Sequence, residues 1–157
     1  MSNAFTAAGT TLAVSADLPT EFSDDETEGY PSLTYTNVGE ITSIPEHGPE
    51  YTLVTHNPLG ERVTVKRKGS VNYGSLTLPL ALDPNDDGQV IMRDFADGPN
   101  VDDSIAVEIT LPDGSVRYFT AQVMSFQEAA DGTDSIASGS VMLEIDRPVV
   151  YVDAAAE

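Results

Sequence analysis

The sequence predicts a mainly β protein: a two-sheet β-sandwich or partial barrel, with one flanking α-helix at about residues 83–97 and a long basic hairpin at about 51–68. Apolar and polar residues alternate through 104–126, which is typical of an antiparallel strand pair with one buried face. Leucines recur at every second position through 74–82. Only one segment combines helical spacing with capping signals, so a single helix packed on β-structure is the economical arrangement.

The N-terminal part begins with an arm, residues 1–9, followed by a short β segment, Thr10–Ser15. Residues 17–31 are rich in Asp and Glu and have no periodic apolar face. We expect a solvated surface loop here, with a mobile arm as the alternative. Apolar residues return at 33–44, and Pro45 then punctuates the chain.

The basic hairpin is predicted from strands at Tyr51–Thr55 and Arg62–Lys68, joined by residues 56–60. Its second strand is unusual because it holds four of the seven basic residues of the chain. One interpretation is an edge strand charged to prevent aggregation. The other is a protruding hairpin that docks on an acidic patch of a neighbouring copy. The basic residues are Arg62, Lys66, Arg67 and Lys68.

The leucine strand at 74–82 contains Pro79, which cannot donate to a ladder, so we expect this strand to be locally unpaired, bulged or at an edge. The helix follows it. Asp83 is a good N-cap, Pro84 suits the first helical position, and Gly98-Pro99 ends the helix. Val90, Ile91, Met92 and Phe95 supply its apolar stripe.

The central hairpin at 104–126 turns at Pro112-Asp113-Gly114, where Pro presets φ and Gly accepts a positive φ. A last strand is expected at Ile136–Ile145, ended by Arg147-Pro148, and residues 151–157 are expected to be a tail. The predicted inward-facing residues of the hairpin are Ile105, Val107, Ile109, Leu111, Phe119, Ala121 and Val123.

Composition restricts the class of protein. A chain of 157 residues with 40% apolar composition can bury one core, so residues 1–157 are expected to form a single domain. The net charge of -19 is unfavourable for binding nucleic acid. It is compatible with a salty cell, and hence a halophilic host, and with a surface that repels polyanions. With no cysteine, disulfides and thiol chemistry are excluded.

No leader pattern or long apolar run is evident, so we expect a soluble protein made in the cytoplasm, without a membrane partner. Enzyme activity is not expected. His47 and His56 lie in predicted loops without a nucleophile motif, and no glycine-rich phosphate loop occurs. Adjacent acids such as Asp102 and Asp103 are more simply explained as hydrated turn residues.

A calcium loop is the alternative interpretation of the helix start. Asp83, Asn85, Asp87, Gly88 and Asp94 match positions 1, 3, 5, 6 and 12 of such a loop, with Asp in place of the usual final Glu. The competing function is therefore a calcium-dependent, acidic extracellular β-sandwich binding module. Against it, no helix is predicted before this segment, and a capped helix explains the same residues.

The order of segments resembles the major tail tube protein of long-tailed phages, a family related in fold to the tube protein of type VI secretion. The resemblance spans about residues 9–150. It is carried by GTTL at 9–12, ITSIPEHGPEY at 41–51, DPNDDGQVIMRDFADG at 83–98, LPDGSVRYFTAQVMSF at 111–126 and VMLEIDRPVV at 141–150.

The resemblance implies a structural virion protein without cofactor, whose copies form stacked rings, usually of six, around a lumen for the genome. Implied partners are further copies and other tail proteins, such as the tape measure and terminator, with DNA passing without being bound. We expect Arg62, Lys66, Arg67 and Lys68 to contact a neighbouring subunit, and Glu108 and Glu144 to be candidates for the lumen wall.

Overall fold

The structure is a computed structural model, and it describes residues 4–154. It is mainly β, with one α-helix, α1 (Asp87–Asp97), and one short 3₁₀ turn, η1 (Tyr30–Ser32). The strands are β1 (Thr11–Ser15), β2 (Thr36–Asn37), β3 (Glu50–His56), β4 (Val65–Asn72), β5 (Ser75–Ala81), β6 (Ser104–Thr110), β7 (Val116–Ala129), β8 (Ser138–Ile145) and β9 (Val150–Val152).

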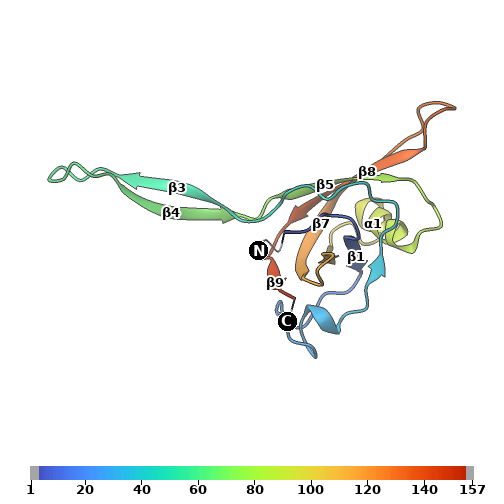
Figure 1. The fold of residues 1–157 in the computed structure, drawn as a ribbon, viewed down its shortest axis with the longest axis horizontal. Coiled ribbons are helices and arrows are strands. Elements are labelled where there is room, and N and C mark those ends of the chain that lie inside the picture. The colour runs from blue at the N-terminus through green and yellow to red at the C-terminus, as the bar shows by residue number, and fades with distance from the viewer. Residues whose placement is uncertain (1–3, 155–157) are drawn as a thin grey trace.

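Two antiparallel sheets make up the β-structure, as the sequence predicted. The larger has seven strands in the order β2-β1-β6-β7-β8-β5, and β9 pairs with the start of β7. The smaller is the β3–β4 hairpin. The hairpin projects from the body and does not stack on the large sheet (Figure 1).

The large sheet is not closed into a barrel, but the segment that follows β2 hydrogen-bonds to β1, next to one edge of the sheet, and to β5 at the other edge. The N–H of Val38 donates to the carbonyl of Leu12 on β1 at 2.9 Å, and the N–H of Thr42 donates to the carbonyl of Pro79 on β5 at 2.9 Å. Residues 38–42 therefore run from the β2–β1 end of the sheet to its edge strand β5. Pro79 lies on an edge strand, as its missing N–H predicted.

The core lies on the face of the large sheet that α1 covers (Figure 1). Period-two alternation directs one set of strand side chains to this face, and Met92 and Phe95 of α1 pack against it. The buried strand residues include three of the four leucines at 74–82 and most of the predicted hairpin residues: Leu76, Leu78, Leu80, Ile105, Val107, Ile109, Phe119 and Ala121.

The helix begins at Asp87 and not at Asp83, which corrects the predicted N-cap. Asp86 is the cap, because its side chain accepts the N–H of Gln89 at 3.1 Å. Asp83 instead accepts the N–H of Asn85 at 3.1 Å, in a turn before the helix. A contact with the segment after β2 favours Asp86 as the cap, since Asp86 also accepts the N–H of Gly39 at 3.0 Å.

The basic hairpin is longer than predicted, because its strands are β3 (50–56) and β4 (65–72). The second strand begins at Val65 and not at Arg62, so Arg62 lies in the connecting loop. In the central hairpin, by contrast, the predicted turn is confirmed: Gly114 has φ +96°, a conformation that favours glycine.

The acidic loop at 17–31 is a surface loop whose last residues pack on the sheet. Its Asp and Glu side chains are exposed, but Tyr30 is fully buried and stacks on Tyr118 of β7 with ring centroids 5.7 Å apart. Phe22 contacts the Tyr30 ring, and the Arg147 guanidinium lies 3.9 Å from the Phe22 ring centroid. These contacts anchor the loop, so the mobile-arm alternative is not needed for these residues.

The predicted C-terminal tail at 151–157 is partly structured. Val150–Val152 form β9, which continues beside β7 where β8 has ended. The predicted N-terminal arm at 1–9 and the tail both extend outside the described residues.

Candidate assembly surfaces

The β3–β4 hairpin is exposed along almost its whole length. Every residue of β3 is exposed, and on β4 only Val65 is half-buried. Lys66, Arg67 and Lys68 lie opposite Thr55, Val54 and Leu53, respectively. Because strand side chains alternate, Lys66 and Lys68 share one face, and Arg67 lies on the other. A two-stranded sheet with no covering layer is marginally stable alone, so this hairpin is suited to being covered by a partner.

The cations of the hairpin have no carboxylate partner among residues 4–154. The ion pair that does form in this part of the chain joins Arg117 to Asp153 at 3.1 Å. The Lys68 ammonium instead lies 4.5 Å from the centroid of the Tyr51 ring. Residues 50–72 hold four basic and two acidic side chains, a formal charge of +2. Since the whole chain carries -19, the remainder carries -21. The hairpin is thus a positively charged projection on an acidic body.

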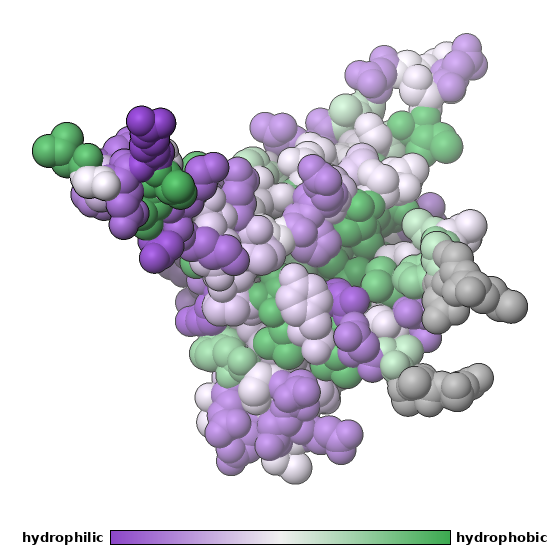
Figure 2. Space-filling model, turned by 60° about the vertical axis from the view of Figure 1, so that its left-hand side comes forward, coloured by the Kyte–Doolittle hydropathy of each residue, from purple (hydrophilic) through white to green (hydrophobic). Residues whose placement is uncertain are grey.

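Large apolar side chains accompany these cations, which the sequence interpretation missed. Leu53 is 63% exposed, and Leu59 in the connecting loop is fully exposed. Val54 and Val63 are also exposed, so hydrophobic and hydrophilic residues lie side by side on the hairpin (Figure 2). The sequence at 51–55 does indicate this apolar surface, because apolar residues occur on both faces of the predicted strand. Such mixed surfaces are typical of interfaces between proteins.

Glu108 and Glu144 lie on the same face of the large sheet, the face opposite α1. The register places Glu108 opposite Tyr118 and Glu144 opposite Gln122, and residues 118 and 122 share one face of β7. Around Glu144 this face is open. Its partly or fully exposed residues there are Ser75, Thr77, Gln122, Met124, Ser140, Met142 and Glu144.

Glu108 is covered, however. Tyr30 and Tyr35 pack over this part of the sheet, and the Tyr35 and Tyr118 rings lie 6.1 Å apart. Burial raises the pKa of the Glu108 carboxyl, while hydrogen bonds from the Tyr118 and Thr110 side chains oppose part of that rise. Burial, with the nearby Glu108 charge, raises the pKa of Tyr118 to about 12. Glu108 is therefore half-buried in a tyrosine cluster, whereas Glu144 lies on the open face.

The residues of the calcium alternative have structural roles or point to solvent. Asp83 accepts the N–H of the exposed Asn85 in the turn before the helix, and Asp87 and Asp94 are exposed on α1. Among residues 4–154, no group of three or more His, Asp or Glu side chains is placed to hold a metal ion. Gly88, the glycine of the proposed loop, lies against the backbone of β2.

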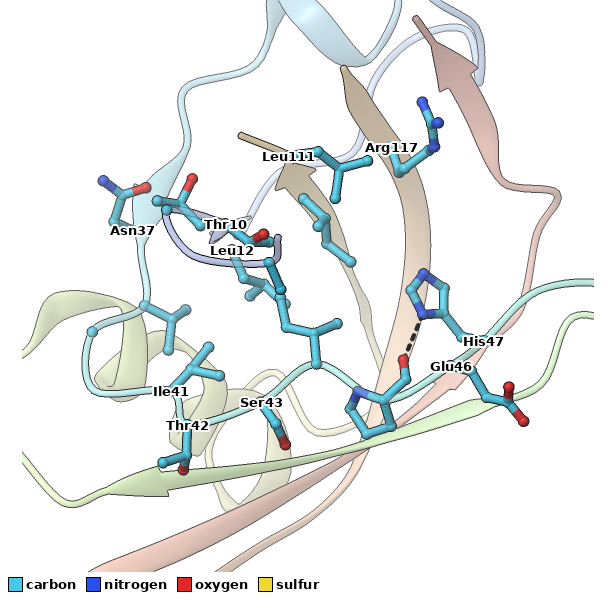
Figure 3. Close-up of a pocket in the computed structure, with 18 of the residues that line it drawn as sticks. Thr10, Leu12, Asn37, Ile41, Thr42, Ser43, Glu46, His47, Leu111 and Arg117 are labelled. Carbon is cyan, nitrogen blue, oxygen red and sulfur yellow. Dashed lines mark hydrogen bonds between the residues drawn. The ribbon is translucent and has the colours of Figure 1, made fainter. Parts of the chain in front are cut away.

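A groove of about 820 Å³ opens between residues 41–47 and the ends of β1 and β6 (Figure 3). Its lining is mostly apolar and includes Leu12 and Ile41. His47 lies at its rim, where its Nδ1 is 3.0 Å from the carbonyl oxygen of Pro45 (Figure 3). The second histidine, His56, is exposed at the end of β3. The structure therefore does not bring the two histidines together.

No helix among residues 4–154 has the length and apolar character needed to cross a membrane.

Comparison with solved structures shows that the fold is shared with components of phage tails and contractile injection systems. No family model matches the chain, and no curated protein matches it in sequence. Among solved structures, a chain of the six-fold symmetrised baseplate of the anti-feeding prophage matches with TM-score 0.70 and 13% identity, covering 97% of each chain.

Two further solved structures are similar over most of this chain. The sheath/tube terminator of an extracellular contractile injection system matches with TM-score 0.68 and 12% identity, over 97% of this chain and 99% of the other. The SPP1 tail tube matches with TM-score 0.61 and 14% identity, over 94% of this chain and 78% of the other. These neighbours are structural parts of particles, not enzymes.

Proposed function

We propose that this protein is the subunit of a tail tube, in which copies close into rings of six and the rings stack around a lumen for the genome. The observation that carries the proposal is the fold match over 97% of the chain. The exposed basic hairpin supports this proposal, because exposed apolar surface on an isolated subunit is typical of a site that a neighbouring subunit covers in an assembly. Its place is the virion tail, after synthesis in the host cytoplasm.

The open face of β5, β8 and the later part of β7 is the proposed lumen wall. It presents Ser, Thr, Gln and Met side chains together with Glu144, and it carries no Lys or Arg. DNA is held chiefly by cations at its phosphates, so such a wall lets it pass without binding. Of the two carboxylates predicted for the wall, Glu144 fits this proposal, and the coverage of Glu108 by Tyr35 makes Glu108 a weaker candidate. Partners such as a tape measure and a terminator belong to the same proposal.

Purified protein is expected to form rings and hollow tubes whose yield rises with salt. Six copies carry 6 × -19 = -114 formal charges, and this mutual repulsion is screened over about 10 Å at 0.1 M salt and about 3 Å at 1 M. Electron microscopy and light scattering across a salt series measure the outcome. Monomers at every protein and salt concentration would contradict the proposal.

Assembled tubes are expected not to bind duplex DNA, and Glu144→Lys is expected to increase DNA retention, because it places a cation at each subunit of the wall. Asp94→Lys is the matched control: it makes the same change in charge on exposed α1, across the sheet from the open face. Retention is measured by filter binding of short duplexes at several salt concentrations. Equal retention by both variants would overturn the assignment of this face to the lumen.

A further inference from the structure

A second projection lies at the other end of the molecule from the basic hairpin. Strands β7 and β8 extend beyond the body and are joined by a loop, and all residues from 127 to 137 are exposed. We define residues 127–137 as the acidic tip. It contains Glu128, Asp131 and Asp134 and no basic residue, a formal charge of -3, together with Ile136, which is 80% exposed.

The two projections point away from each other. Figure 1 shows the β3–β4 hairpin extending to one side and the β7–β8 connection extending to the other, and the turned view in Figure 2 keeps them at opposite ends. Within one copy they therefore do not meet. Between copies that are stacked in the same orientation, the hairpin of one faces the end of its neighbour that bears the tip.

We propose that the basic hairpin of one copy binds the acidic tip of a second copy, so that copies join head to tail. This inference rests on the proposed tube function and names the contact between successive rings. A head-to-tail contact uses two different surfaces, so it leaves one of each free at the ends and builds an open filament. Rings that stack without limit need a contact of this kind.

The two surfaces match in charge and in apolar character. The hairpin brings Lys66, Arg67 and Lys68, which have no carboxylate partner among residues 4–154, and the tip brings three exposed carboxylates without cations between them. Ile136 on the tip and Leu53 on the hairpin are each an exposed apolar side chain beside those charges. Contact between two hairpins is disfavoured because both carry the same sign of charge.

The first experiment uses wild-type tubes. Lys66 and Lys68 provide the side-chain amines of the chain. A water-soluble carbodiimide joins an amine to a carboxylate only when they are in contact. Mass spectrometry of the cross-linked peptides is expected to find Lys66 or Lys68 joined to Glu128, Asp131 or Asp134. Tubes in which these lysines are joined only to other carboxylates overturn the inference and leave the tube function intact.

The second experiment reverses the tip with Glu128→Lys, Asp131→Lys and Asp134→Lys. This changes the net charge from -19 to -19 + 6 = -13, so weaker general repulsion alone predicts easier polymerisation. The head-to-tail contact predicts the opposite: a fall of about tenfold in the polymerised fraction. Polymerisation equal to or better than wild type overturns the inference.

A charge swap distinguishes the contact from damage to the subunit. The tip reversal is combined with Lys66→Glu, Arg67→Glu and Lys68→Glu, which returns the net charge to -19. Tubes are expected to form again, with an acidic hairpin now bound to a basic tip. Failure of the swap to restore tubes, while each subunit keeps its unfolding temperature, overturns the inference. Wild-type protein that never forms rings or tubes overturns the proposed function as well.

Discussion

Tubes are expected to disappear when Lys66, Arg67 and Lys68 are all replaced by Glu, while the monomer stays folded. The three side chains are exposed and make no ion pair within the described residues, so their loss removes little from the folded subunit. The net charge falls to -19 - 6 = -25, and the positive surface of the hairpin becomes negative.

The size of the effect follows from repetition. One exposed ion pair contributes about 0.2 to 1 kcal/mol, which is small for a single contact. In the proposed tube each subunit repeats the contact, however, and the contacts of one ring act together because the subunits of that ring are joined to one another. A loss of about 1.4 kcal/mol in each contact weakens it tenfold, so six contacts between two rings lower ring stacking by many orders of magnitude.

Electron microscopy gives the length distribution, and sedimentation gives the polymerised fraction. The double variant Lys66→Arg, Lys68→Arg is the control, since it keeps the charge of the hairpin and is expected to form tubes of wild-type length. A thermal unfolding midpoint equal to that of wild type shows that the triple variant is folded. Wild-type tube length in the triple Glu variant would leave edge protection as the explanation of these charges.

The sequence was sufficient for the fold wherever local pattern and tertiary contact agree. In residues 104–126 the alternation of apolar residues, the Pro-Asp-Gly turn and the buried face all specify the same hairpin, and β6 and β7 confirm it. Pro79 was similarly informative, because a missing N–H restricts a strand to an edge.

Tertiary contacts decided the features that were missed. Tyr30 ends a highly charged loop, and nothing local shows that it is buried against Tyr118. The same packing covers Glu108, which the period-two pattern alone had assigned to an open polar face. Val150–Val152 is too short to be recognised as a strand, and β7 supplies its pairing partner.

The candidate site was predicted only in part. The hairpin was identified from the sequence because four of the seven basic residues of the chain are concentrated at 62–68. The acidic tip could not be distinguished from other acidic loops, since only the three-dimensional arrangement places it at the opposite end of the molecule from the hairpin. The helix start shows the same limit: its acids match both a calcium loop and an N-cap, and the contact of Asp86 with Gly39, a residue distant in sequence, favours the cap.

Gly88 lies at the start of α1, where the close approach of the helix to residues 37–38 leaves no room for a side chain. A Cβ at residue 88 would lie 2.4 Å from the carbonyl oxygen of Asn37 and 2.7 Å from the Cα of Val38. Both are backbone atoms that cannot turn aside. The helix is held close to this segment because the buried Gln89 amide donates at 3.0 Å to the carbonyl of Gly39, just after β2, and to the carbonyl of Ala81 at the end of β5.

Gly88→Ala is therefore expected to destabilise the subunit by about 2 to 4 kcal/mol, through overpacking and the strain placed on the Gln89 hydrogen bonds. For a domain of this size that is a fall of roughly 5 to 15 °C in unfolding temperature. Helix propensity alone predicts the opposite sign, since Ala in a helix is favoured over Gly by about 1 kcal/mol.

Thermal and urea unfolding of the monomer measure this effect, with Gly132→Ala as the matched control. A Cβ at residue 132 would meet no atom within 4 Å, so its unfolding temperature is expected to equal that of wild type within about 2 °C. An unchanged or raised unfolding temperature in Gly88→Ala would mean that α1 can move away from β2 without cost. The close approach of the helix to residues 37–38 would then not be what requires glycine at this position.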